Sequence, residues 1–486
     1  MSSKSVPRIS LETTGDAALD RILGGGIPTQ SLVIVAGEPG SGKTVMTLQM
    51  LFHAARAGKK SLYFTTLSEP AVKVIRYMQM FEFFDPELLD EHVVMSDLGK
   101  VIREGAAATL AELEKRVSDH EPAFVVIDSF KVVAELLRPE ASARSMLYDL
   151  AVTMAAWGAT TILVGEYTRA DLALCAEFAI ADGILQLTTA KQGLTAVREI
   201  EVLKMRGAAN RGGTHFYEIA SRGVAFFPRV SAPTELESAA NEETSERAAF
   251  GVAGLDEALG GGVPRNGTTV IQGATGTGKT LLGLQYLLEG VRQGERGMLF
   301  TLEETPGQLR AIGRSLGWDL AELEAREQLT IRYASPVELS TDRYLYQCRN
   351  ELAETGARRA VFDSLTTMSL GVSSERRFKE MIYAITKHLR LAGVTSVMTA
   401  ESPQLLGHAQ LAGDGVSFIA DNVIITRYVE LDGRIERAIS VLKARGIEHD
   451  SELRQMKIKR GGIDVGGGFK DLLGVLTGVP ARKAAT

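Results

Sequence analysis

The chain has 486 residues, of which 45% are hydrophobic and 23% charged, and it carries a formal net charge of −6 at pH 7. This length exceeds what one hydrophobic core usually serves, so we expect more than one domain, and the ordinary composition argues against disorder, collagen and coiled coil. The negative charge also weakens the case for general nucleic-acid binding.

Apolar runs of strand length and amphipathic stretches alternate along the chain, in the same order twice. The expected strands of the first half are Ser31–Ala36, Ser61–Thr66, Phe124–Asp128 and Thr160–Gly165, and those of the second half are Thr268–Gln272, Met298–Leu302, Ala360–Asp363 and Thr395–Thr399. Expected helices between them include Thr44–Ala57, Ala107–Ser118 and Arg376–Ala392. Continuous apolar strands separated by helices predict an α/β fold with mainly parallel sheets that helices cover on both faces.

Four motifs occur twice at nearly constant spacing. They are a Leu-Asp followed by Gly-Gly-Gly-x-Pro (Leu19 and Leu255), a glycine loop ending in Gly-Lys-Thr (Gly37 and Gly273), an Asp-Ser after a strand (Asp128 and Asp363), and Lys-x-Arg-Gly (Lys204 and Lys443). The copies are 235 to 239 residues apart, so a whole domain is duplicated in tandem. We expect domains at residues 1–230 and 248–486, joined by an exposed Ser/Thr/Ala/Glu-rich linker at 231–247.

The duplicated G-x-x-x-x-G-K-T sequence is a phosphate-binding loop, because it follows an expected strand and opens an expected helix. Its glycines let backbone N–H groups point at a triphosphate, and the helix N-terminus adds a favourable dipole. We expect Lys43 and Lys279 to reach the β- and γ-phosphates of ATP. The predicted ATP-binding residues are Gly37, Gly40, Ser41, Gly42, Lys43 and Thr44 in the first copy, and Gly273, Thr275, Gly276, Thr277, Gly278, Lys279 and Thr280 in the second.

Two carboxylates and two hydroxyls are candidate Mg²⁺ ligands. Asp128 and Asp363 end apolar strands about 85 residues beyond the glycine loops, where a carboxylate can hold the hydration shell of a metal. Thr44 and Thr280 would offer a hydroxyl to the same ion. The alternative for each aspartate is a cap of the turn that follows the strand.

The sequence after the second expected strand offers a base for the attacking oxygen. Glu303 and Glu304 lie beside the expected position of the γ-phosphate, and a pair of carboxylates can divide proton acceptance from orientation of the nucleophile. The first copy keeps only Glu69 after Ser68, so we expect the two sites to differ in rate. A solvated glutamate near a helix start is the alternative interpretation.

The basic motif, Lys204 with Arg206 and Lys443 with Arg445, follows a strand far along the chain from its phosphate loop. Such residues are candidates for fingers that stabilise phosphate charge from a neighbouring subunit. The alternative is a solvated surface, which the repetition of the motif makes less attractive.

These motifs together resemble those of the KaiC family of circadian-clock ATPases and autokinases, in the same order over nearly the whole chain. The resemblance implies two RecA-like P-loop domains per chain and a homo-hexamer that forms a double ring, with ATP between neighbouring subunits. It also implies a slow ATPase in the first ring, autokinase and autophosphatase activity in the second, and KaiB-like or other regulatory protein partners.

The family presents a neighbouring Ser and Thr in the second domain as phosphate acceptors, and this chain departs from that pattern. Ser417 falls on the first acceptor and Phe418 on the second. Because an aromatic carbon cannot take a phosphoryl group, a two-site phosphorylation cycle is excluded. Autophosphorylation at Ser417 alone is the expectation, and an ordinary buried serine is the alternative.

The cysteine content, the amino-terminal segment and the expected pore loops bear on the compartment and on the alternative functions. Two cysteines, Cys175 and Cys348, indicate a reducing compartment, and the polar Met1–Ser10 and the absence of a long apolar run lead us to expect a cytoplasmic protein without a membrane span. A RecA- or helicase-like DNA-remodelling ATPase would need basic and aromatic pore loops, whereas Ser402–Ser417 contains no Lys, Arg or aromatic residue. A plain nucleotide-gated scaffold without autophosphorylation is the third interpretation.

Overall fold

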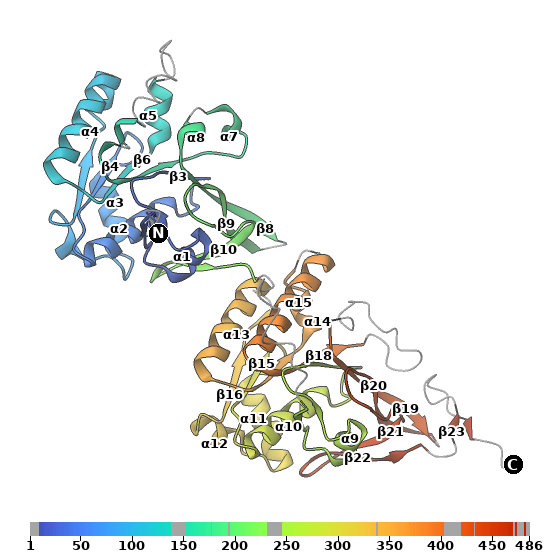
Figure 1. Cartoon of the computed structure of the whole chain (residues 1–486). Helices are drawn as coiled ribbons and strands as arrows, with labels where there is room; N and C mark the ends of the chain where they lie inside the picture. The colour runs from blue at the N-terminus through green and yellow to red at the C-terminus, as the bar shows by residue number, and fades with distance from the viewer. Residues whose placement is uncertain are drawn as a thin grey trace, which may run out of the picture. The chain divides into compact units, whose positions relative to one another are not determined.

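The structure is a computed structural model of the whole chain, drawn in Figure 1. It describes residues 9–137, 152–154, 156–175, 177–192, 195–230, 245–336, 339–372, 374–402, 419–431, 433–469, 472–473 and 481–482. The chain divides into two compact units, Met1–Arg229 and Val230–Thr486. Most of the expected linker, residues 231–244, lies outside the described residues.

The first unit is built on a nine-stranded sheet in the order β11-β10-β9-β8-β3-β7-β6-β4-β5. Neighbours from β8 to β5 pair in parallel, and β8, β9, β10 and β11 pair antiparallel. The strands are β3 (Leu32–Gly37), β4 (Ser61–Thr65), β5 (Val93–Asp97), β6 (Phe124–Asp128), β7 (Thr160–Gly165), β8 (Gly183–Gln192), β9 (Thr195–Met205), β10 (Thr214–Ala220) and β11 (Gly223–Phe227).

Helices alternate with the strands of the first unit. The main ones are α1 (Ala17–Leu23), α2 (Lys43–Arg56), α3 (Ala71–Met78), α4 (Ala106–His120) and α5 (Phe130–Leu137), followed by the short α7 (Asp171–Leu174) and α8 (Glu177–Ile180). Short strands β1 (Leu11–Glu12) and β2 (Ile27–Pro28) pair beside α1. Apolar residues of α4 and α5 form one core with Ile34, Phe64 and Ile127 of the sheet.

The second unit repeats this architecture in the order β16-β15-β17-β18-β14-β19-β20-β21-β22. Its strands are β14 (Thr268–Gly273), β15 (Gly297–Thr301), β16 (Leu329–Tyr333), β17 (Arg359–Asp363), β18 (Thr395–Glu401), β19 (Asn422–Leu431), β20 (Arg434–Ala444), β21 (Arg454–Lys459) and β22 (Gly462–Gly468). The short β12 (Arg247–Ala248) and β13 (Val263–Pro264) pair like β1 and β2.

Successive strand residues of the second unit face two different cores, as a sheet with helices on both faces requires. Leu299 and Val361 pack in one core with α9 (Ala253–Ala258), α10 (Lys279–Arg292), α11 (Pro306–Leu316) and α12 (Leu320–Ala325). Phe300 and Phe362 pack in the other core with α13 (Thr341–Thr355), α14 (Leu365–Ser369) and α15 (Glu375–Leu391). Figure 1 shows α13 and α15 on one side of the sheet and α10 to α12 on the other.

The expected fold class is confirmed, with two α/β domains of the RecA type. The eight strands that were predicted by residue range lie within two residues of the observed β3, β4, β6, β7, β14, β15, β17 and β18. The edge strands β5 and β16 and the strands β8–β11 and β19–β22 were not predicted by residue range. The carboxyl-terminal segment contributes Phe469, which packs against Val429 and Ala438, and the two-residue strands β23 (Leu472–Leu473) and β24 (Ala481–Arg482). Among the described helices, none has the length and the apolar character needed to cross a bilayer.

Candidate active sites

Both glycine loops leave the carboxyl end of a buried strand and open a long helix. The first connects β3 to α2 and contains Gly37, Gly40 and Ser41, and the second connects β14 to α10 and contains Gly273, Thr275, Gly276 and Thr277. Gly42 and Gly278, the helix N-caps, have φ of 85° and 102°, a left-handed conformation that residues with a Cβ disfavour. The turn therefore offers backbone N–H groups and a helix N-terminus to an anion.

The loop lysines lie folded within their own loops. The ammonium group of Lys43 donates hydrogen bonds to the carbonyl oxygens of Gly37 (3.0 Å) and Glu38 (2.9 Å), and that of Lys279 donates to Ala274 (3.1 Å). Lys43 is only 7% exposed, and this burial lowers its pKa. Each lysine is thus positioned at the mouth of its loop, where terminal phosphates would lie.

Asp128 is the polar centre of the first site. Its Oδ2 atom accepts hydrogen bonds from the hydroxyls of Thr44 and Tyr63, each at 2.6 Å. Burial raises the pKa of this carboxyl group, and the two hydroxyls and Lys43 act in the opposite direction. The structure therefore brings together the predicted pair of Thr44 and Asp128, and it adds Tyr63, which the sequence analysis missed.

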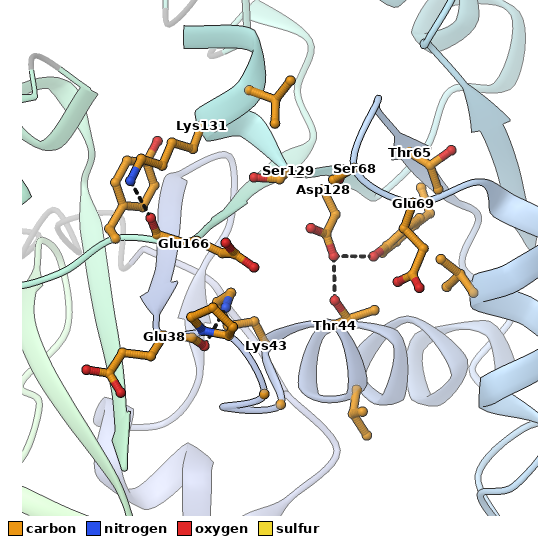
Figure 2. A pocket seen from close by; sticks show the side chains of 18 of the residues that line it. Glu38, Lys43, Thr44, Thr65, Ser68, Glu69, Asp128, Ser129, Lys131 and Glu166 are labelled. Atoms are coloured by element: carbon orange, nitrogen blue, oxygen red, sulfur yellow. Dashed lines mark hydrogen bonds between the residues drawn. The ribbon is translucent and has the colours of Figure 1, made fainter. Parts of the chain in front are cut away.

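A cavity of about 720 Å³ opens over this site, within the size range of small-molecule sites. Figure 2 shows Asp128 between Glu69 on one side and Glu166 with Lys43 on the other. The predicted Glu69 lines the cavity, but its carboxylate pairs with Lys73 at 3.0 Å. Glu166 was not among the predicted site residues.

Asp363 occupies the equivalent position in the second site and is 2% exposed. The Thr399 hydroxyl donates to its Oδ1 atom, whereas Oδ2 is buried and accepts no hydrogen bond of normal geometry from the described residues. Burial raises the pKa of Asp363, against the lowering effects of the Thr399 and Thr280 hydroxyls. An unpaired buried carboxylate oxygen costs free energy, so a bound cation would gain from it.

The two predicted glutamates of the second site have different surroundings. Glu303 accepts hydrogen bonds from the hydroxyls of Ser364 (2.6 Å) and Thr367 (3.0 Å) at the start of α14. The Oε2 atom of Glu304 is buried without a hydrogen-bond partner in the described residues. Burial, Asp363 and Glu303 all raise the pKa of Glu304. Glu303 is thus held in place, whereas Glu304 has an increased affinity for a proton.

The hydroxyls that hold Glu303 have no full counterpart in the first site. Since Asp128 and Ser129 match Asp363 and Ser364, the residue equivalent to Thr367 is Val132, which cannot donate a hydrogen bond. No sequence motif predicts these hydroxyls, because only the fold brings them close to Glu303. The one available signal was a serine or threonine within four residues after the strand-end aspartate.

The basic motif lies away from the phosphate loop of its own domain. Lys204 of β9 pairs with Ile184 of β8, which in turn pairs with Ile34 in the middle of β3. The backbone N–H of Arg206 donates to the carbonyl oxygen of Asp182, just before β8 begins. The five residue steps from Leu32 to Gly37 place Arg206 about 16 Å from the loop along the strand direction. The ammonium groups of Lys204 and Lys443 contact the carbonyl oxygens of Ala179 and Ala420, which precede β8 and β19.

Arg206 and Arg445 are exposed at this edge of the sheets, and each lies near an aspartate. Arg206 is 3.3 Å from Asp182, and Arg445 is 3.9 Å from Asp421. The structure therefore does not bring the four basic residues to the phosphate loop of their own domain. Ser417 and Phe418 lie outside the described residues, which stop at Ser402 and resume at Ile419.

Comparison with known proteins gives one consistent family. The family model for the KaiC ATPase matches residues 13–231 and again residues 248–468. The circadian clock protein KaiC3 of Synechocystis is 30% identical over 97% of this chain and 94% of its own length. The clock oscillator proteins KaiC of Thermosynechococcus vestitus and Synechococcus elongatus are 29% and 28% identical over 99% and 95% of this chain, and over 93% and 90% of their own lengths.

The raised pKa of Glu304 makes stability depend on this residue in a definite direction. The carboxyl group binds protons more tightly in the folded than in the unfolded chain, so its ionisation destabilises the folded state above the folded pKa. We expect Glu304→Gln to raise the thermal unfolding midpoint of the nucleotide-free chain by about 1–3 °C at pH 7.5. The gain should shrink as the pH falls through the folded pKa, and it should vanish below the ordinary value of 4.5, where the group becomes neutral in both states.

The matched control is Glu303→Gln, measured by circular dichroism under the same conditions. Because Ser364 and Thr367 already satisfy Glu303, neutralising it should give no gain in stability. An equal gain for both variants, or none for Glu304→Gln, would contradict the described difference between the two carboxylates.

Proposed function

Because the chain belongs to the KaiC family of ATPases, we propose that it hydrolyses Mg·ATP at two sites, one in each RecA-like domain. The observation that carries this proposal is the pair of unpaired carboxylate oxygens on Asp363 and Glu304, buried beside the second phosphate loop. The Asp363 oxygen can bind a cation, and the Glu304 oxygen can accept a proton. Phosphoryl transfer requires both a bound cation and a proton acceptor in addition to the loop lysine.

The residues present fit a magnesium ion. Thr44 with Asp128, and Thr280 with Asp363, supply the hard oxygen atoms that Mg²⁺ prefers. In the first site the Thr44 hydroxyl donates a hydrogen bond to the Asp128 carboxylate, so the two groups lie close enough together to bind the same ion. Bound Mg²⁺ would neutralise charge on the β- and γ-phosphates.

We assign the remaining roles by position. Lys43 and Lys279 bind the terminal phosphates, Glu304 accepts the proton of the attacking oxygen, and Glu303 orients that oxygen. In the first site Glu69 is the only one of the proposed glutamates that interacts with the attacking oxygen, and its carboxylate also forms an ion pair with Lys73. The first site therefore hydrolyses ATP more slowly than the second.

Each site is completed by a neighbouring copy of the chain, in the hexameric double ring that membership of the family suggests. Lys204 and Arg206 serve the first site of the neighbour, and Lys443 and Arg445 serve its second site. Their place at the opposite edge of the sheet supports this assignment, because they lie too far along the strands to serve the phosphate loop of their own domain.

The second site also phosphorylates Ser417, the one acceptor that this sequence retains at the family position. We further propose that nucleotide turnover times the binding of regulatory protein partners in the cytoplasm. A plain ATPase scaffold without autophosphorylation is the second candidate, because Phe418 removes half of the acceptor pair. A DNA-remodelling ATPase is not favoured, since the relatives carry clock-protein names.

Sharing of sites between copies predicts complementation in mixed assemblies. In a Lys279→Ala background, we expect Lys43→Ala and the double change Lys204→Ala with Arg206→Ala each to lose most first-site hydrolysis, by about tenfold or more. Mixing the two variants before assembly should restore activity, because some boundaries then combine an intact loop with intact basic residues. Phosphate release from matched amounts of single and mixed variants measures the effect.

Mixing after assembly serves as the control and should restore less. Should the co-assembled mixture stay as inactive as either variant, the basic residues would not act across a subunit boundary. Full activity of the double variant by itself would remove them from the site altogether.

Autophosphorylation is tested with γ-labelled ATP on the parent chain, Ser417→Ala and Glu304→Gln. We expect label on the parent protein only, because one variant lacks the acceptor and the other the base. Label retained by Ser417→Ala would contradict the acceptor, and label retained by Glu304→Gln would contradict the base. Phosphate release without label on the parent protein would favour the plain ATPase.

A further inference from the structure

A glutamate that has no role in the proposed reaction stands beside each phosphate loop. Glu166 directly follows β7, whose last residue pairs with Ala36 of β3. Glu401 ends β18 and pairs with Gly273, the first glycine of the second loop. The same carboxylate therefore occurs at the same register position in both domains, on the strand next to the loop strand.

In the first site this carboxylate faces the space where phosphate would bind. Glu166 lines the cavity together with Lys43 and Asp128, and Figure 2 shows its side chain directed into the space between those two residues. Burial lowers the pKa of Lys43, and Glu166 opposes that effect more strongly than Asp128 does. The negative charge of Glu166 is thus felt at the ammonium group that would hold the terminal phosphates.

Among the described residues, no lysine or arginine forms an ion pair with the Glu166 carboxylate. The carboxylate of Glu166 has no hydrogen-bond or ion-pair partner in the part of the chain that the structure describes. The nearby Lys131 donates instead to the backbone carbonyl of Glu166 at 2.7 Å, and its ammonium lies 5.4 Å from the Tyr167 ring centre and 3.7 Å from Asp171. The Glu166 carboxylate therefore faces the cavity beside Lys43 without a hydrogen bond or ion pair from the described residues.

The second site holds its glutamate differently. Glu401 accepts a hydrogen bond from the Thr275 hydroxyl of the phosphate loop, and its backbone N–H donates to the Thr366 hydroxyl at 2.8 Å. In the first loop Pro39 occupies the position of Thr275 and offers no hydroxyl. The charge of Glu401 is partly satisfied by the loop, whereas that of Glu166 is not.

We propose that Glu166, and to a smaller degree Glu401, sets the preference of its site between nucleoside triphosphate and nucleoside diphosphate. The proposal rests on the proposed function, because Lys43 must contact the terminal phosphates. The γ-phosphate brings extra negative charge close to the carboxylate, and like charges repel. ADP lacks that group and keeps its charge further away, so the glutamate weakens ATP binding more than ADP binding.

The test measures nucleotide binding in the full chain with the second site silenced by Lys279→Ala. Dissociation constants for Mg·ADP and for the magnesium complex of a non-hydrolysable β,γ-imido ATP analogue are determined for this parent and for Glu166→Gln. Removing the charge while keeping the side-chain shape should shift the affinity ratio in favour of the triphosphate by roughly three- to tenfold. The shift should shrink at high salt.

The matched control is Glu114→Gln, which removes one negative charge from an exposed position of α4 and should leave the ratio unchanged. An unchanged ratio in Glu166→Gln, or equal weakening of both nucleotides, would overturn the proposal. Loss of hydrolysis with an unchanged ratio would overturn it as well, and would assign Glu166 to the attacking water. Absence of nucleotide binding in the Lys279→Ala parent would instead contradict the proposed function.

The second site gives an internal comparison. In a Lys43→Ala background, Glu401→Gln should shift the same ratio less than Glu166→Gln does, because Thr275 already engages the carboxylate. A larger shift at Glu401 would contradict the part that Thr275 plays in the proposal.

Discussion

Parallel strand pairing is the constraint on which both sites depend. In each sheet the phosphate-loop strand, the strand that ends in Asp128 or Asp363, and the strand before Glu69 or Glu303 run in one direction, so their carboxyl ends meet at one edge. Residues some 85 positions apart in sequence thereby come within hydrogen-bonding distance. Both candidate sites lie at that edge, as is usual for ligand sites in open α/β sheets.

The antiparallel strands place the basic motif at the opposite end of the sheet from the phosphate loop. A hairpin from β8 to β9, or from β19 to β20, returns the chain to the amino edge of the sheet, so the Lys-x-Arg motif ends away from its own loop. Within each domain, the phosphate loop and the basic motif are therefore separated. This separation is the structural ground for our proposal that a neighbouring copy completes each site, because the phosphate loop and the basic motif of one domain lie at opposite ends of the strands.

The sequence predicted groups that form a continuous motif or end an apolar run, such as the phosphate loops and Asp128. It did not reveal Tyr63, whose hydroxyl reaches Asp128 from a neighbouring strand, nor Thr399, which does the same for Asp363 from another strand. Such contacts depend on the register between strands that are distant in sequence. The range of strand β9 was not predicted because three of the four residues from Arg198 to Glu201 are charged, unlike the continuous apolar runs of the parallel strands.

The most direct measurement of the central claim is an experimental structure of the assembled protein with Mg²⁺ and a non-hydrolysable ATP analogue. The account predicts two triphosphates per chain, with Lys43 and Lys279 on the terminal phosphates, Asp128 and Asp363 at the metal, and the basic motifs contributed by the adjacent copy. Triphosphates remote from both lysines, or enclosed entirely by one chain, would contradict it.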